Sequence, residues 1–149
     1  MKQTEDTSLK WDVFITPGIP VVTSTPAPNT KETFWNPTSS TLIYGKRDAV
    51  LVDVPTTWQQ AITLAWWVRD SCKNLTTIYI THGHADHWFG VSALLDRFPN
   101  VKVVATPGTV KVMRALSQGA RRSGTHFFLV RYQSVAINSL LFFGSKKKD

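Results

Sequence analysis

Short apolar runs bounded by turn-forming residues recur along the chain and predict β-strands. These runs are residues 11–16, 41–44, 49–54, 75–81 and 101–106. The polar turn Gly45-Lys46-Arg47-Asp48 separates the second run from the third, so we expect those two strands to form a hairpin. The stretch from residue 17 to residue 38 is rich in Pro, Thr and Ser, which is typical of a loop.

Helical patterns lie between the later strands. Thr57 and Gln60 fit a capping box, with Thr57 as the N-cap of a helix that runs to about residue 71. Apolar residues then fall at helical spacing on one face, which we expect to be buried. They are Trp58, Ala61, Ile62, Ala65 and Trp66, and Leu64, Trp67 and Val68 widen this face. Two further helices are predicted at residues 88–98 and at about 110–116.

The alternation of strand and helix after the hairpin indicates an α/β fold, in which helices cover a sheet. The length of 149 residues suits one domain, and a chain of this size can bury a core. We expect a disordered N-terminus at residues 1–10 and a domain at residues 11–116. An atypical basic and apolar tail follows at residues 117–149, beginning with a flexible linker at 118–125.

The net charge of +7 is unevenly distributed. Residues 110–149 hold eight basic residues and one acid, so this part accounts for the whole charge, and residues 1–109 are neutral. No nucleic-acid partner is therefore expected. Cys72 is the only cysteine, which excludes an internal disulfide, and we expect it to be buried near a helix end. No apolar run follows the N-terminus, which favours a cytoplasmic protein over a secreted one.

The apolar run at residues 126–143 is near the length of a membrane span. However, Arg131, Gln133 and Asn138 lie inside it, and such residues make insertion costly. We therefore expect no membrane partner.

One segment carries recognisable chemistry, His82-Gly83-His84-Ala85-Asp86-His87. It follows a predicted strand directly, at the carboxyl end where α/β sheets usually bind ligands. Three imidazoles and one carboxylate within six residues are the nitrogen and oxygen donors that zinc takes in proteins. His82 and His84 can reach one metal ion, and Asp86 and His87 can reach a second. Two such ions can polarise a substrate carbonyl or phosphoryl oxygen together.

The His-x-His-x-Asp-His string resembles the zinc signature of the metallo-β-lactamase superfamily. The flanks, about residues 11–116, are similar as well, with Leu51-Val52-Asp53 at the place of an early aspartate of that family. The resemblance implies one or two Zn²⁺ ions held by His82, His84, Asp86 and His87, with Asp53 orienting the site. It also implies an αββα sandwich, of which this chain holds the first half.

The resemblance implies hydrolysis of a small-molecule acyl bond (a lactam, lactone or thioester) by attack of metal-bound hydroxide. Asp86 would be the catalytic residue that orients the nucleophile. Trp88 and Phe89 fit either the wall of a substrate cleft or the core of the following helix. The substrate class is not encoded in the motif itself.

The later part of the chain departs from the family pattern. The second half of the fold supplies further ligands, yet His126 is the only histidine after His87, and Asp149 is the only acid after Asp96. His126 is a candidate for a missing ligand. The alternative function is a truncated, catalytically inactive fragment that binds metal weakly or not at all. A further alternative is a homo-oligomer, in which two chains each contribute half of a site.

Overall fold

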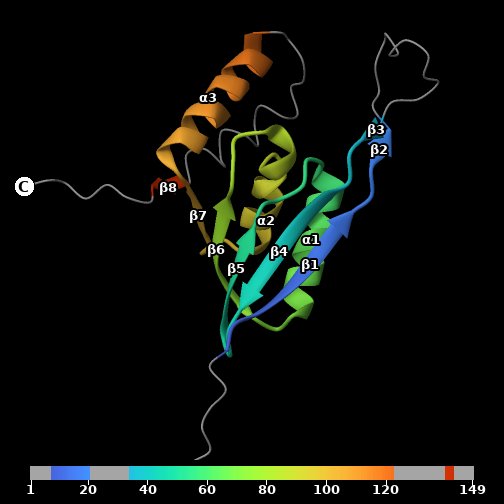
Figure 1. The fold of residues 1–149 in the computed structure, drawn as a ribbon, viewed down its shortest axis with the longest axis vertical. Coiled ribbons are helices and arrows are strands. Elements are labelled where there is room, and N and C mark those ends of the chain that lie inside the picture. Colours follow the sequence, from blue (N-terminus) through green and yellow to red (C-terminus); the bar gives the residue numbers. More distant parts are fainter. Residues whose placement is uncertain (1–7, 21–33, 123–139, 143–149) are drawn as a thin grey trace, which may run out of the picture.

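The centre of the protein is a six-stranded sheet with the strand order β1-β4-β5-β6-β7-β8 (Figure 1). The computed structural model describes residues 8–20, 34–122 and 140–142, with side chains described at 8–20 and 34–118. The strands of the sheet are β1 (Lys10–Thr16), β4 (Thr38–Tyr44), β5 (Asp48–Val52), β6 (Asn74–Ile80), β7 (Lys102–Ala105) and β8 (Leu140–Phe142). Neighbouring strands from β1 to β5 are antiparallel, and those from β5 to β8 are parallel.

The five predicted strands are all present, and β4 and β5 form the predicted hairpin. The amide of Gly45 donates to the carbonyl of Asp48 at 3.0 Å, which closes its turn. The loop prediction for residues 17–38 is wrong at both ends, because β2 (Ile19–Pro20) pairs with β3 (Phe34–Trp35). Composition does not reveal this pairing, since it joins residues that are distant in sequence.

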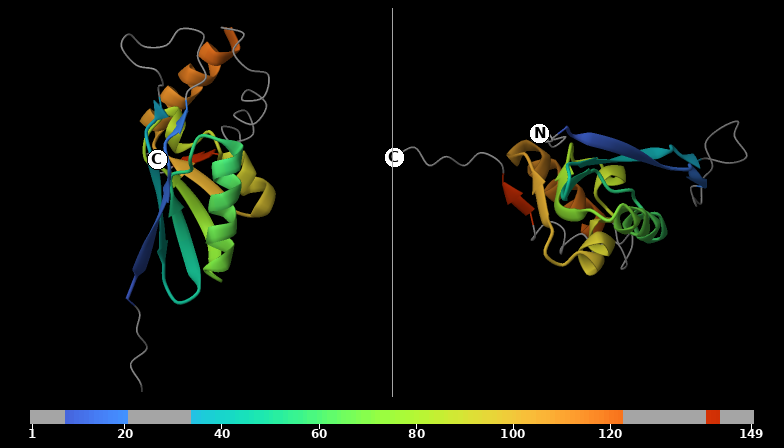
Figure 2. Two further views of the ribbon diagram at one scale, coloured as in Figure 1. Left: turned by 90° about the vertical axis from the view of Figure 1, so that its right-hand side faces the viewer. Right: turned by 90° about the horizontal axis from the view of Figure 1, so that it is seen from below.

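In the described part of the chain, three α-helices accompany the sheet. They are α1 (Trp58–Asp70), α2 (Val91–Arg97) and α3 (Pro107–Arg122). The predicted capping box of α1 is confirmed, with the amide of Gln60 donating to Oγ1 of Thr57 at 3.2 Å. Helices α1 and α2 lie on one face of the sheet (Figure 2). Of the helices in the described part of the chain, none is long and apolar enough to cross a membrane.

Two helix predictions need correction. Helix α2 begins at Val91 instead of residue 88, because residues 85–87 form a 3₁₀ turn within the motif. Helix α3 begins earlier, with Pro107 at its first position, where proline is favoured. It also continues to Arg122, so the predicted linker is helical over residues 118–122. Gln, Ala and Arg are good helix formers, and one glycine among them costs only about 1 kcal/mol.

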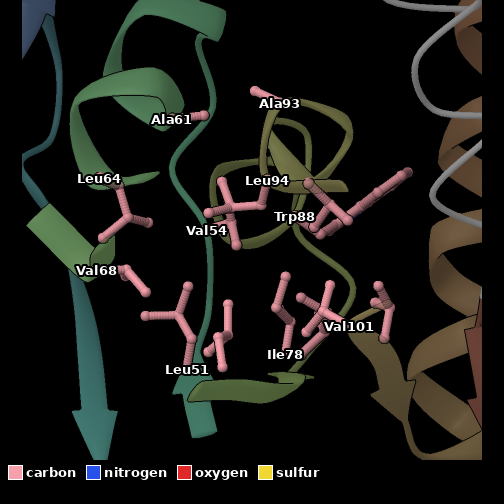
Figure 3. Close-up of a cluster of buried hydrophobic side chains, with 14 of the residues drawn as sticks. Leu51, Val54, Ala61, Leu64, Val68, Ile78, Trp88, Ala93, Leu94 and Val101 are labelled. Carbon is pink, nitrogen blue, oxygen red and sulfur yellow. The ribbon is translucent and has the colours of Figure 1, made fainter. Parts of the chain in front are cut away.

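The core lies between the sheet and the α1–α2 layer (Figure 3). Leu51 and Ile78 come from central strands, and Leu64 and Leu94 come from α1 and α2. All four are fully buried. Trp88 joins them from the loop after β6, with no exposed surface. Trp88 is therefore a core residue. The alternative prediction, that it forms a wall of a substrate cleft, is wrong.

The buried stripe of α1 is narrower than predicted. Its buried residues are Ala61, Leu64, Ala65 and Val68, whereas Trp58 and Trp66 are exposed. The guanidinium groups of Arg69 and Arg97 both lie over the Trp66 ring, 4.2 and 4.1 Å from its centroid. Both tryptophans lie at the edges of the buried stripe. Helical spacing alone does not predict whether a neighbouring element covers a ring at such a position.

Cys72 is also exposed, which corrects the prediction that it is buried. It has a φ of 55°, in the left-handed region, and its amide donates to the carbonyl of Arg69 at 3.0 Å. A left-handed residue commonly ends a helix in this way. The side chain therefore turns away from the core as the chain leaves α1.

Candidate metal centre

The histidine-rich motif lies in the loop that leaves β6 at the carboxyl end of the parallel strands. Three hydrogen bonds to backbone carbonyl groups hold this loop in place. The indole Nε1 of Trp88 donates to the carbonyl of Gly83 at 3.0 Å, inside the core. The amide of Val54 donates to the carbonyl of His87 at 2.8 Å, and the Thr109 hydroxyl donates to the carbonyl of Thr81 at 3.3 Å. The loop is therefore tied to the end of β5 and to α3.

Gly83 is required because α3 crosses the motif at very close range. A Cβ atom at this position would lie 2.5 Å from Cβ of Val112 and 3.1 Å from the amide nitrogen of Met113. Both distances are shorter than side chains normally tolerate. The small residue between the first two histidines thus allows α3 to pack against the loop.

Asp53 links the end of β5 to the motif. It is 7% exposed and has a φ of 61°, a left-handed conformation that aspartate adopts more readily than most residues. Its Oδ1 accepts from the amide of Thr81 at 2.8 Å. Its Oδ2 accepts from the Thr81 hydroxyl at 2.7 Å and lies 2.8 Å from Nδ1 of His87.

These contacts assign a proton to Nδ1 of His87, because a carboxylate only accepts hydrogen bonds. Nε2 of His87 is then the nitrogen with a lone pair for a metal ion. The same reasoning extends to His82, whose Nδ1 lies 3.0 Å from the Thr81 hydroxyl. That hydroxyl donates to Asp53 and therefore accepts from Nδ1 of His82. One carboxylate thus orients two imidazoles, one directly and one through a threonine.

His82 stands at the centre of the motif's side chains. Its ring centroid lies 4.9 Å from that of His84 and 4.0 Å from that of His87. Nε2 of His87 lies 3.7 Å from Oδ2 of Asp86. The motif is therefore compact, with His84 exposed and the side chains of Asp86 and His87 partly exposed at 36% and 24%.

The geometric grouping differs in part from the predicted one. Among the described residues, Asp53, His82 and His87 have donor atoms within 4.8 Å of one another. The sequence predicts the pairs His82–His84 and Asp86–His87, with Asp53 as an orienting residue. Since both Asp53 oxygens already accept hydrogen bonds, we favour the orienting role, and the ligand assignment stays a prediction. His126 lies outside the described residues.

Thr81 is the residue of this site that sequence reasoning missed. Its backbone amide and its hydroxyl both bind Asp53, and the hydroxyl also contacts His82. In the sequence, the feature that points to Thr81 is its position directly before the first histidine, together with its hydroxyl group. Its importance depends on Asp53, which lies 28 residues earlier in the chain.

The donor set fits a zinc site. Imidazole nitrogen and carboxylate oxygen are zinc ligands, and histidine ligands usually donate their other N–H to a carboxylate, a carbonyl or water. His87 makes such a contact with Asp53, and His82 makes one through Thr81. The orientation of both rings is therefore fixed by residues of the chain itself.

Comparison with known families agrees with this geometry. The family model described as metallo-beta-lactamase superfamily matches residues 33–139, most of the chain and all of the motif. The chain belongs to the metallo-beta-lactamase superfamily. The match reaches beyond residue 116, where the sequence places the end of the domain. A search of curated proteins found no match.

Solved metallo-beta-lactamase structures share part of this fold. DIM-1, determined after exposure to ceftazidime, is 19% identical with a TM-score of 0.51 and covers 75% of this chain and 49% of its own. VMB-1 is 19% identical with a TM-score of 0.50 and covers 77% of this chain and 46% of its own. FIM-1 from Pseudomonas aeruginosa, in a mono-zinc form, is 17% identical with a TM-score of 0.49 and covers 72% and 42%.

The chain therefore spans less than half the length of these metallo-beta-lactamases. Its architecture is a partial metallo-β-lactamase fold, a mixed α/β sheet with helices, as the sequence predicts. The superfamily consists generally of hydrolases.

Proposed function

We propose that this superfamily member is a zinc-dependent hydrolase of a small-molecule acyl bond in a lactam, lactone or thioester. One observation carries the proposal. Asp53 accepts from Thr81 and His87, and Thr81 in turn contacts His82, so two imidazoles of the motif are held in place. Rings fixed in this way present their remaining nitrogens to a metal ion at little conformational cost.

His82, His84, Asp86 and His87 would hold the metal, as one ion or as two. When bound, zinc polarises a carbonyl oxygen and lowers the pKa of a water molecule to about 7. Asp53 keeps the proton on Nδ1 of His87. Asp86 is partly exposed and lies close to His87. From this position its free carboxylate oxygen can orient an attacking water molecule and accept a proton from it.

The proposed substrate class rests on what surrounds the motif. The domain is neutral outside its last helix and tail, so nothing in it favours a polyanion such as a nucleic acid. Turnover of nitrocefin, an acyl-homoserine lactone or an acyl thioester, with none of a phosphodiester, is the expected result. Turnover of the phosphodiester alone would contradict the substrate class while leaving the metal site intact.

The first experiment is the zinc content of the purified full chain after exhaustive dialysis, measured by elemental analysis. We expect zinc near one or two equivalents per chain. The matched control is the double variant H82A/H87A, which should retain none. If the unaltered chain also retains none, the proposal fails, and the alternative of an inactive fragment with weak or no metal binding is correct.

A further inference from the structure

The start of α3 contacts the metal motif on both sides of His82. Before His82, the hydroxyl of Thr109 donates to the carbonyl of Thr81 at 3.3 Å. After it, Gly83 lies so close to α3 that a Cβ atom there would be 3.1 Å from the amide nitrogen of Met113. One helix therefore contacts both chain neighbours of this histidine.

The position of α3 follows from the sheet. Strands β6 and β7 are parallel and in register up to the pair of Ile80 and Ala105, so both end at the same edge. Each is followed at once by a threonine, Thr81 after β6 and Thr106 after β7. Helix α3 starts directly after Thr106, beside the loop that leaves β6 (Figure 1). Strand pairing thus places the first turn of the helix next to the motif.

Thr109 is held in place by hydrogen bonds of its own. Its amide donates to Oγ1 of Thr106 at 3.2 Å, which is the contact made by an N-cap residue. The hydroxyl oxygens of the two threonines lie 3.0 Å apart. Because the Thr109 hydroxyl uses its proton for the Thr81 carbonyl, the Thr106 hydroxyl donates to it. Thr109 is also only 8% exposed, so water has little access to its hydroxyl.

The carbonyl that Thr109 binds belongs to the peptide group between Thr81 and His82. A peptide group is planar, so fixing its carbonyl oxygen also fixes the amide of His82 and the direction in which the chain enters that residue. Asp53 accepts from the amide and the hydroxyl of Thr81. Asp53 and Thr109 together therefore bind all three polar groups of Thr81.

We propose that Thr109 is a positioning residue of the metal centre, through which α3 holds His82 in its metal-binding orientation. The inference rests on the proposed zinc site and adds to it a residue from a separate helix. Thr109 acts on zinc affinity through the backbone of Thr81. Its hydrogen bond of 3.3 Å is longer than the about 2.5–3.0 Å usual between a hydroxyl and an oxygen. We therefore expect a smaller effect than the about 10–100-fold loss that follows removal of a direct partner of a metal ligand.

The first measurement is the zinc affinity of the full chain carrying T109V, by competition with a chromophoric chelator. T109V should bind zinc about 3–10-fold more weakly than the unaltered chain, and T109S, which keeps the hydroxyl, should restore the affinity. T76V is the matched control. The Thr76 hydroxyl also donates to a backbone carbonyl, that of Ala49 at 3.1 Å, but it lies near the start of β6, at the opposite end of the strand from the motif.

The second measurement requires no metal. Hydrogen exchange of the metal-free chain, followed by mass spectrometry of peptides that cover residues 81–88, reports how firmly the loop is held. T109V should exchange faster in these peptides than the unaltered chain, whereas T76V should exchange at the same rate. Far-ultraviolet circular dichroism must show that each variant is folded. If T109V does not fold, T109A replaces it in both measurements.

The outcomes separate this inference from the proposed function. If the unaltered chain binds zinc, equal affinity in T109V overturns the positioning role while the zinc site stands. A loss in T76V or T109S as large as that in T109V also overturns it, because the hydroxyl of Thr109 is then not the cause. If the unaltered chain binds no zinc, the proposed function fails and hydrogen exchange decides: faster exchange in T109V supports the positioning of the loop by α3, and unchanged exchange overturns it.

Discussion

Oδ2 of Asp53 lies 2.8 Å from Nδ1 of His87, a contact between residues 34 positions apart in the chain. It joins the end of β5 to the end of the metal motif. Since the same oxygen accepts from the Thr81 hydroxyl, one carboxylate determines the orientation of the loop's first and last histidines. The metal affinity of the motif should therefore depend on a residue that lies outside it.

Replacing Asp53 tests whether orientation of the histidines controls metal binding. D53N keeps the side-chain shape but loses the charge, and its amide group can donate where the carboxylate accepts. Loss of such a partner typically lowers metal affinity about 10–100-fold, which is the expected effect on zinc binding. Competition with a chromophoric chelator measures the affinity. D70N is the control, because Asp70 is exposed and ion-paired with Arg69. Equal zinc affinities for D53N and D70N would refute the orienting role.

Gly83 is expected to tolerate no side chain. In G83A, the new Cβ would collide with Cβ of Val112, so α3 must shift, at a cost of about 1–3 kcal/mol in the free energy of unfolding. Urea denaturation measures this change in the free energy of unfolding. G108A is the matched control on α3, because its Cβ would meet only Oγ1 of Thr106 at 3.9 Å, and no loss of stability is expected. Adding V112G should recover part of the G83A loss, and full additivity of the two changes would argue against the collision.

The capping box of α1 predicts that T57A loses a small amount of folding stability. The hydroxyl of Thr57 accepts from the amide of Gln60, and the Thr57 amide donates to Oε1 of Gln60 at 3.2 Å. Removing an N-cap side chain costs about 1 kcal/mol. For a chain of this size, that lowers Tm by about 2–4 °C. T57S keeps the acceptor and should melt within about 1 °C of the unaltered chain. A T57S loss as large as that of T57A would show that the hydroxyl is not the cause.

The Asp12 carboxylate raises the pKa of Tyr44 above its ordinary value of 10.0, mainly by accepting a hydrogen bond from the hydroxyl at 2.8 Å. The folded chain therefore favours neutral Tyr44. The resulting stabilisation is complete below pH 10.0 and is lost as pH rises through the folded-state pKa. D12N should lower this pKa, as measured by tyrosinate absorbance. Y44F identifies which part of the titration belongs to Tyr44. An unchanged titration in D12N would contradict the assigned cause.

Local patterns in the sequence located most of the helices and strands and indicated the chemistry of the motif. Hydrophobic spacing and the capping box located α1, and apolar runs located the five principal strands, because these signals depend on neighbours within a few residues. The donor types of His82, His84, Asp86 and His87 likewise indicated a metal site without reference to any other part of the chain.

Tertiary structure decided which surfaces are covered and which distant groups meet. Trp66 and Cys72 are exposed although their local patterns favour burial, because exposure depends on what packs against a residue. Thr81 acquired its place in the site only when β5 and β6 paired and brought Asp53 beside it.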